Sequence, residues 1–318
     1  MSAEGRVVPP RHSVSGLRAR LQKSALWWSF RRSRQAMVSS AVVCVLVLAC
    51  LMAPWIAPHN PLDLASLNLS DALLPPAWLE GGSWAYPLGS DGQGRDLLSA
   101  ILYGTRTSLA VGVASVVFAL LLGVTLGLTA GYAGGFIDAA IMRLADIQWS
   151  FPAILVALLI DGIARNILPR QQQDQIAVYV LILAIGVSGW VQFARTVRGK
   201  TMVEKSKEYV QAARVTGVHP LRIMFSHVLP NTIGPVMVIG TIYLAIAIIV
   251  EATLSFLGVG IPSTKPSLGT LIRIGSNMLM SGEWWVTLFP ALTLATLVLS
   301  VNILGDWLRD TLNPKLRA

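Results

Sequence analysis

Apolar runs about as long as a lipid bilayer is thick recur along this chain, and they constrain its fold more than any other feature. A helix that crosses a hydrocarbon core of roughly 30 Å needs about 20 apolar residues. With 54% hydrophobic residues, 13% charged residues and a mean hydropathy of +0.62, the chain has more apolar surface than it could hide in water. We therefore expect an all-α membrane protein with six transmembrane helices, the third of them short, at 36–57, 109–130, 148–160, 175–194, 232–257 and 286–304.

The distribution of charge predicts the side of the membrane on which each connection lies. The opening segment 1–35 is rich in Arg and contains the single acid Glu4, and the connection 195–231 is also basic. The connection 58–106 is acidic, with Arg95 and Arg106 as its cations. Lys and Arg concentrate on the cytoplasmic side of membrane proteins. We therefore expect both termini in the cytoplasm, with an N-terminal tail 1–35, a first span 36–57, an extracytoplasmic loop 58–106, a core helical region 107–306 and a C-terminal tail 307–318.

The basic connection 195–231 predicts two helices separated by a bend. Good helix formers dominate 197–215, and Gly217 follows at a position where a left-handed cap is easiest for a residue without a Cβ. Pro220 suits the first turn of a second, short helix, and Pro230 and Pro235 mark the return to apolar sequence. A short helix at the tip of a basic loop is well shaped to enter a groove on a soluble partner.

Glycines recur at every fourth position of the second span, at Gly123, Gly127, Gly131 and Gly135. This spacing clears one face of a helix and allows a neighbouring backbone to approach closely. The following segment 136–149 contains too many charges for a span and predicts a short helix at the cytoplasmic surface. The segment 161–174 is expected to be an outer loop.

A glycine-rich segment, PLGSDGQGRDLLS at 87–99, precedes the second span. Its residue types are compatible with a turn that starts a helix. A phosphate-binding loop is not expected, because no strand precedes the glycines. The residues that stand out are Gly89, Asp91, Gly94, Arg95 and Asp96.

Several other classes of function are disfavoured by the sequence. Gly199, Lys200 and Thr201 match the end of a nucleotide-binding loop, but the glycine that this loop needs five residues earlier is Ala194. The four histidines are scattered without metal-ligand spacing, so no metal site is expected, and no catalytic group has a placed partner. Basic and aromatic residues do not interleave on a polar face, which argues against nucleic acid as a partner.

Four stretches of the sequence resemble one family. YVQAARVTG at 209–217 with HVLPN at 227–231 is similar to the loop of ABC-importer permeases that carries a Glu-Ala-Ala, Gly, Leu-Pro pattern, with Gln211 at the usual Glu position and His227 at a usual Ile. Segment 87–99 resembles the start of the transport domain in permeases of the dipeptide and oligopeptide type. EATLSFLGVGIP at 251–262 and NILGDWLRD at 302–310 resemble the fifth span and the C-terminal signature of the same family, so the resemblance covers roughly 88–316.

The resemblance implies an ABC importer type I permease fold and the role of the second membrane subunit of a peptide importer. The expected partners are a homologous permease subunit, two ATP-binding subunits that hold ATP and Mg²⁺, an extracytoplasmic substrate-binding protein and the lipid bilayer of a bacterial inner membrane. This chain itself is expected to bind no cofactor. A coupling helix near 217–225 is implied to rest on the ATP-hydrolysing subunit, and the residues expected to make or shape that contact are Glu208, Tyr209, Ala212, Ala213, Gly217, Val218, His219 and Pro220.

Glu251 is an acid deep in a predicted span, where a carboxylate costs on the order of 2.5 kcal/mol or more unless it pairs or faces a cavity. Two roles stay open: bracing the outer loop, or lining the translocation pathway or its outer gate. Ser255, Gln148 and Trp149 are candidates for the same pathway.

The substrate also stays open at this level. Nickel or metallophore, opine, glutathione and antimicrobial-peptide importers share this type of permease, because specificity rests mostly on the binding protein. An alternative of a different class is a six-span channel or receptor with a basic cytoplasmic loop, which would work without an ATPase.

Overall fold

The computed structural model of the chain describes residues 27–63, 67–167, 169–262 and 264–312. The described residues are largely helical, and β-type pairing among them is confined to an isolated bridge between Ser90 and Asp96, so the all-α prediction is confirmed. Positions 1–26 and 313–318 of the predicted tails lie outside the described residues. The main helices are α2 (Arg34–Leu51), α3 (Ala53–Ile56), α4 (Leu97–Ala133), α5 (Gly135–Trp149), α6 (Ala153–Ile167), α7 (Arg170–Glu204), α8 (Glu208–Val215), α9 (Pro220–Ile223), α10 (Leu229–Phe256), α11 (Leu268–Ser276) and α12 (Trp285–Leu312).

Within the described part of the chain, five helices are long and apolar enough to cross a bilayer: α2, α4, α7 from Ile176, the stretch from α9 through α10, and α12. The pair α5 and α6 counts as a sixth span only if it is taken together, because the two helices meet at 92°. The predicted third span, 148–160, has the wrong bounds. Phe151 precedes Pro152, which disfavours helical backbone at that point, so the helix breaks there and a second one continues to Ile167.

The predicted outer loop 161–174 is also wrong over most of its length. α6 passes through Asp161, which is buried, and α7 begins at Arg170. The side chain of Arg165, one turn later, donates from Nε to the Asp161 carboxylate at 2.5 Å. This pair explains how a charged residue continues an apolar helix instead of ending it.

Three helices extend beyond their apolar runs. α4 begins at Leu97, so residues 97–106 of the predicted outer loop are helical. α7 continues to Glu204, well into the basic connection, and α12 continues to Leu312 through part of the predicted C-terminal tail. An apolar run marks the part of a helix that suits lipid, whereas the helix itself ends only where its last backbone groups are capped.

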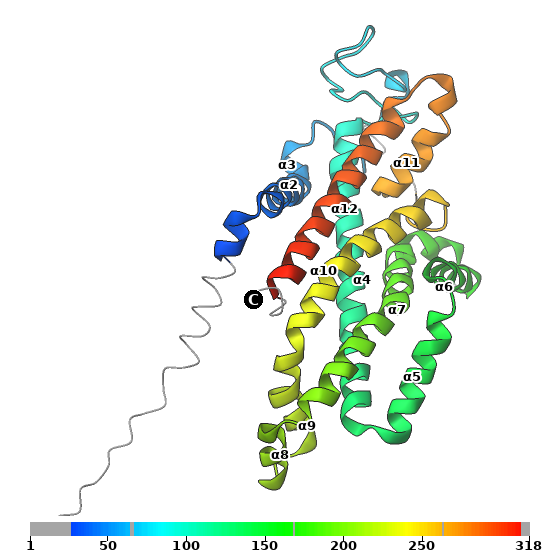
Figure 1. The fold of residues 1–318 in the computed structure, drawn as a ribbon. Coiled ribbons are helices and arrows are strands. Elements are labelled where there is room, and N and C mark those ends of the chain that lie inside the picture. Colours follow the sequence, from blue (N-terminus) through cyan, green and yellow to red (C-terminus); the bar gives the residue numbers. More distant parts are fainter. Residues whose placement is uncertain (1–26, 64–66, 168, 263, 313–318) are drawn as a thin grey trace, which may run out of the picture.

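α4 and α7 pack side by side along most of their lengths (Figure 1). A Cβ added at Gly123 or Gly127 would lie 2.5 Å or less from a backbone carbonyl oxygen of α7, at Trp190 or Ala194. Gly131 is similarly close to Arg198 and Thr201. The close approach predicted from the glycine spacing is therefore confirmed for these three residues. It is wrong for Gly135, which has a φ of +56° and no neighbour within 4 Å.

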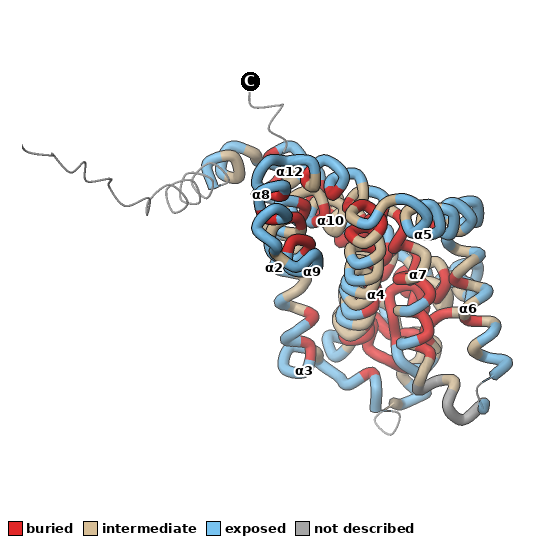
Figure 2. Tube along the Cα trace, turned by 90° about the horizontal axis from the view of Figure 1, so that it is seen from below, coloured by how far each residue is buried: buried red, intermediate tan, exposed pale blue. Residues whose placement is uncertain are grey.

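Buried positions gather where α4, α7 and α10 face one another (Figure 2). α2 is different, because only 17% of its most apolar window is buried, against 44% for α7. The apolar surface of α2 therefore faces outward, as expected of a helix that meets lipid or another subunit.

The described beginning of the chain lies against the end of α12. The rings of Phe30 and Trp307 pack edge to face with centroids 5.3 Å apart, and the hydroxyls of Ser29 and Thr311 are 3.2 Å apart. Both ends of the described chain are thus at the same end of the bundle. Their location in the cytoplasm remains a prediction from charge.

Candidate functional site

The basic connection folds as a helical hairpin, defined here as residues 205–228, between α7 and α10. Gly217 has a φ of +74°, and the amide of Val218 donates to the carbonyl of Ala213 at 3.0 Å, which caps α8. His219 then caps α9 by accepting the amide of Leu221 at Nδ1, and Pro220 occupies the first turn. The predicted bend and restart are confirmed. The predicted continuous helix 197–215 is wrong, because residues 205–207 interrupt it.

Tyr209 fastens the base of this hairpin. Its hydroxyl donates to the Glu204 carboxylate at 2.6 Å and accepts from Asn231 Nδ2 at 3.1 Å. Lys207 Nζ donates to the other oxygen of Glu204 at 2.6 Å. Desolvation, together with the hydrogen bond to Glu204, raises the pKa of Tyr209 to about 12. These contacts join the end of α7, the start of α8 and the start of α10.

The tip of the hairpin exposes apolar side chains. Val215 is 89% exposed, Leu221 is 56% exposed and Phe225 is 50% exposed, although the segment is basic and polar overall. Sequence reasoning did not single out these three residues, and their apolar character within a basic loop was the available signal. Exposed apolar side chains of this kind are typical of a surface that a partner covers.

The predicted contact residues divide between this surface and the interior. Ala213 is buried in the hydrophobic core, whereas Ala212 faces outward. Gly217 and Pro220 are exposed at the bend, between the exposed residues of α8 and those of α9. Glu208, Tyr209 and His219 are exposed, and Val218 is half-buried.

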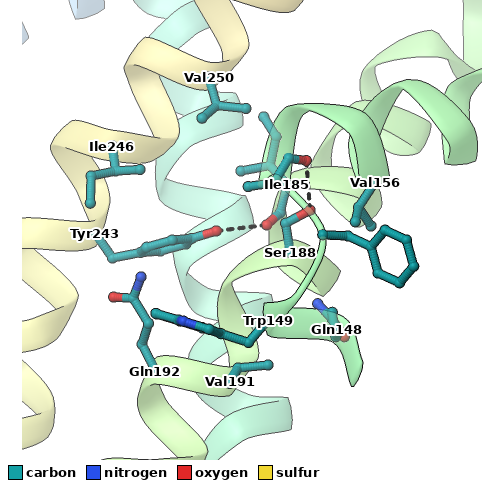
Figure 3. A pocket seen from close by; sticks show the side chains of 12 residues that line it. Gln148, Trp149, Val156, Ile185, Ser188, Val191, Gln192, Tyr243, Ile246 and Val250 are labelled. Atoms are coloured by element: carbon teal, nitrogen blue, oxygen red, sulfur yellow. Dashed lines mark hydrogen bonds between the residues drawn. The ribbon is translucent and has the colours of Figure 1, made fainter. Parts of the chain in front are cut away.

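A cavity of about 240 Å³ opens beside the break between α5 and α6 (Figure 3). Gln148 and Trp149, both predicted for the pathway, line it. Gln148 accepts the indole N–H of Trp190 at 2.6 Å, which fixes the amide of its side chain. The sequence did not indicate Tyr243, whose hydroxyl donates to the Ile185 carbonyl at 2.7 Å across the cavity.

The cavity has a mixed lining that suits passage of a polar solute. Ser188, Gln192 and Gln148 provide hydroxyl and amide groups, and aromatic and aliphatic side chains provide the rest. α7 and α10 both contribute to this lining, and both also flank the hairpin. The same two helices therefore connect the hairpin and the cavity.

Glu251 and Ser255 do not line this cavity. Both are 0% exposed, and the Ser255 hydroxyl donates to Glu251 Oε1 at 2.8 Å, while Glu251 Oε2 is buried without a hydrogen-bond partner among the described residues. Ser255 Oγ also accepts the amide of Ile261 at 3.3 Å in the connection that follows α10. In this conformation the geometry favours bracing of that connection over a lining role for Glu251.

The glycine-rich motif folds into a compact turn that starts α4. Asp91 and Arg95 form a buried ion pair at 2.7 Å, and Asp96 caps α4 by accepting the amide of Ser99 at 2.8 Å. Gly89 and Gly94 have φ values of +85° and +73°, which favour glycine. Outside the spans, burial and a hydrogen bond to Asp71 raise the pKa of Tyr86 beside this turn. The five predicted residues therefore shape the turn and the helix start.

Comparison with known proteins agrees with this arrangement. A family model described as binding-protein-dependent transport system inner membrane component matches residues 123–318, and one for the N-terminal transmembrane domain of oligopeptide transport permease C matches residues 23–76. The chain therefore belongs to the family of inner membrane components of binding-protein-dependent transport systems. It is a multi-pass inner membrane protein of an ABC transport system.

Curated relatives narrow this class. The dipeptide transport system permease protein DppC of Haemophilus influenzae is 38% identical, over 92% of this chain and 94% of that protein. The protein of the same name from Escherichia coli K12 is 39% identical over 92% of each chain, and the oligopeptide transport system permease protein OppC of Bacillus subtilis is 35% identical over 91% of this chain and 88% of its own length. Within the family, this chain is a C-type permease subunit of the peptide type.

The fold has a counterpart among solved structures. A chain from inward-facing conformations of the MetNI methionine ABC transporter aligns with a TM-score of 0.53 and 20% identity, covering 68% of this chain and 97% of that one. The predicted type I ABC importer permease fold is thereby confirmed. Membership of this family also argues against the channel or receptor alternative.

Proposed function

We propose that this chain forms half of the translocation pathway of an ATP-driven importer of dipeptides or oligopeptides. A homologous permease subunit forms the other half, two ATP-binding subunits hold ATP and Mg²⁺, and an extracytoplasmic binding protein delivers the peptide. The names of the curated relatives support a peptide substrate. The chain itself carries out no covalent step.

The observation that carries the proposal is the braced hairpin with its exposed apolar tip. Val215, Leu221 and Phe225 offer a surface for the ATP-binding subunit, and Tyr209 ties the hairpin to α7 and α10. When ATP closes the pair of ATP-binding subunits, the hairpin moves with them. Because α7 and α10 also line the 240 Å³ cavity, this movement changes access to the cavity.

The same proposal sets the orientation of the chain in the membrane. The hairpin and both termini face the cytoplasm, and the turn that contains Asp91 faces the binding protein, in the plasma membrane of a bacterium. The basic character of the hairpin and the acidic character of segment 58–106 support this orientation.

Leu221→Asp tests the contact with the ATP-binding subunits. A carboxylate at the apolar tip opposes burial, so we expect at least a tenfold loss of the ATP-binding subunits that co-purify with the chain. Leu279→Asp is the matched control, because Leu279 is also exposed, at 48%, but lies between α11 and α12, and α11 is at the opposite end of the bundle from α8 and α9 (Figure 1). Unchanged stoichiometry with Leu221→Asp would contradict the proposal.

Gly217→Asp tests the bend itself. The added side chain at a φ of +74° strains the cap and places a charge at the tip, so we expect an inserted subunit without peptide uptake in reconstituted vesicles. Uptake at the parental rate would refute the role of the bend.

Ser188→Trp tests the pathway, because the indole fills the cavity without touching the hairpin. We expect peptide uptake to stop while the ATP-binding subunits still co-purify. Val117→Trp, on an exposed face of α4, is the control and should transport normally. Normal uptake by Ser188→Trp would exclude this cavity from the route.

The exact substrate is a separate question from the route. Nickel or metallophore, opine, glutathione and antimicrobial-peptide systems use the same type of permease. Mass spectrometry of the ligand that co-purifies with the cognate binding protein decides among them, and a ligand without a peptide bond would contradict the peptide assignment.

A further inference from the structure

A second cavity, of about 450 Å³, lies toward the Leu97 end of α4, away from the hairpin. One face of α4 lines it with Tyr103, Arg106 and Thr107 at helical spacing, followed by small and aliphatic residues further along the helix. Val178 of α7 and the loop residue Lys265 lie across from them. None of the functions assigned above uses this cavity.

The charges of the cavity are unusual for its surroundings. Arg106 and Lys265 both line it, and none of the residues that line it carries a carboxylate. Each of the ion pairs within 4.0 Å in the described part of the chain involves other cations, namely Arg95, Arg165, Arg195, Arg198 and Lys207. Arg106 and Lys265 are both exposed, so their charges are accessible to a solute in the cavity. Two cations in one mostly aliphatic cavity therefore point to an anion as its occupant.

The second cavity and the 240 Å³ cavity described above, called here the first cavity, are both lined by residues of α7. Val178 and Ile182 line the second cavity, and Ile185 and Ser188 line the first. These positions follow one another at intervals of three or four residues, so they share one broad face of the helix, and Val178 to Ser188 spans about 15 Å. The two cavities therefore follow one another along this face of α7.

We propose that the second cavity binds an anionic group attached to a short apolar body, and that this group is the terminal carboxylate of the transported peptide; the second part rests on the proposed import function. The guanidinium of Arg106 matches the two oxygens of a carboxylate, and Lys265 adds a second charge. The hydroxyl of Tyr103 adds a donor, and the aliphatic lining accepts an apolar side chain. A lipid phosphate group has the same chemistry, and the experiment separates the two sources.

The test measures protection of the Lys265 amine from a water-soluble acylating reagent, read by mass spectrometry. The full chain is used in phosphatidylcholine nanodiscs with the subunits that co-purify with it. The probes are trialanine and its C-terminal amide. We expect trialanine to protect Lys265 and the amide not to do so. Lys200, which is exposed near the other end of α7, is the internal control and should react equally in all samples.

Variants of Arg106 make the test specific. Arg106→Gln should raise the trialanine concentration for half-protection about fivefold or more, because a charged donor is lost. Arg106→Lys keeps the charge and should raise this half-protection concentration less. Arg143→Gln removes an exposed cation outside the cavity and should leave the half-protection concentration unchanged. Equal protection by trialanine and its amide, or an unchanged half-protection concentration in Arg106→Gln, overturns the site.

Two further arms separate the possible sources of failure. Protection that follows added phosphatidylglycerol and not trialanine assigns the cavity to lipid and overturns the peptide assignment. Uptake of trialanine by reconstituted vesicles is measured in parallel. Uptake without protection of Lys265 refutes the site and leaves the import function standing, whereas protection without uptake refutes the import function and leaves the site standing.

Discussion

Replacement of Tyr209 by Phe probes the brace at the base of the hairpin. The change removes one hydroxyl, which donates to the Glu204 carboxylate at 2.6 Å and accepts from Asn231 at 3.1 Å. A hydrogen bond to a charged group contributes about 1.5–3 kcal/mol. Glu204 keeps its bond from Lys207, and Tyr209 is 39% exposed, so water replaces part of the loss. We therefore expect a cost of about 1 kcal/mol, which makes local opening of the hairpin about five times more frequent.

Hydrogen exchange of the backbone amides in residues 208–228 measures this opening directly. We expect exchange there to be about five times faster in Tyr209→Phe, with helix α4 unaffected. Tyr179→Phe is the control, because Tyr179 is 66% exposed on α7 and far along the helix from the hairpin. Peptide uptake should fall together with the loss of protection, since a loose hairpin transmits less motion. Unchanged exchange in the hairpin would refute the brace, whatever happens to uptake.

Three further outcomes are expected. Gly127→Leu should lower the melting temperature of the protein in detergent, because the new Cβ would lie 2.4 Å from a carbonyl oxygen of α7 and overpacking costs about 1–3 kcal/mol. Gly162→Ala should leave the melting temperature unchanged, because the space around Gly162 is open. Asp91→Asn should make the turn at 87–99 more sensitive to protease, because breaking the buried ion pair with Arg95 costs about 3–5 kcal/mol. Asp146→Asn breaks an exposed ion pair, so it should cost less than about 1 kcal/mol and leave proteolysis unchanged. The Tyr209 phenol should ionise near pH 12 and not near pH 10, so its contribution to hairpin stability is complete below pH 10 and is lost as the pH rises to 12. A titration of the difference in absorbance between the parent and Tyr209→Phe measures this ionisation. Ionisation near pH 10 would contradict the expectation.

Features set by local chemistry could be predicted from the sequence. The apolar runs identified the spans, because a helix in lipid must satisfy its backbone internally and present apolar side chains. Gly217 and Pro220 identified the bend of the hairpin, since each has a backbone conformation that few other residues match. The spacing of Gly123, Gly127 and Gly131 identified one packing face of α4.

Features that depend on distant contacts could not be predicted in the same way. Asp161 was predicted to begin a loop, but it is buried in α6, where its partner Arg165 also donates to the distant Val259 carbonyl at 3.0 Å. Glu251 suited both a pathway-lining role and a bracing role on sequence alone, and its complete burial beside Ser255 favours bracing. The meeting of α5, α7 and α10 around the 240 Å³ cavity joins residues about 100 positions apart, from Gln148 to Val250.

The sequence by itself determined the family, the spans other than the third and the bend, because each is encoded by residues close together in the chain. The tertiary structure alone decided which polar groups are buried as braces and which line a cavity, and it brought Arg106 and Lys265 to one place. The reason is physical: the free energy of a charged or polar side chain depends on the solvent and the partners around it, and in a helical bundle those are supplied by other helices.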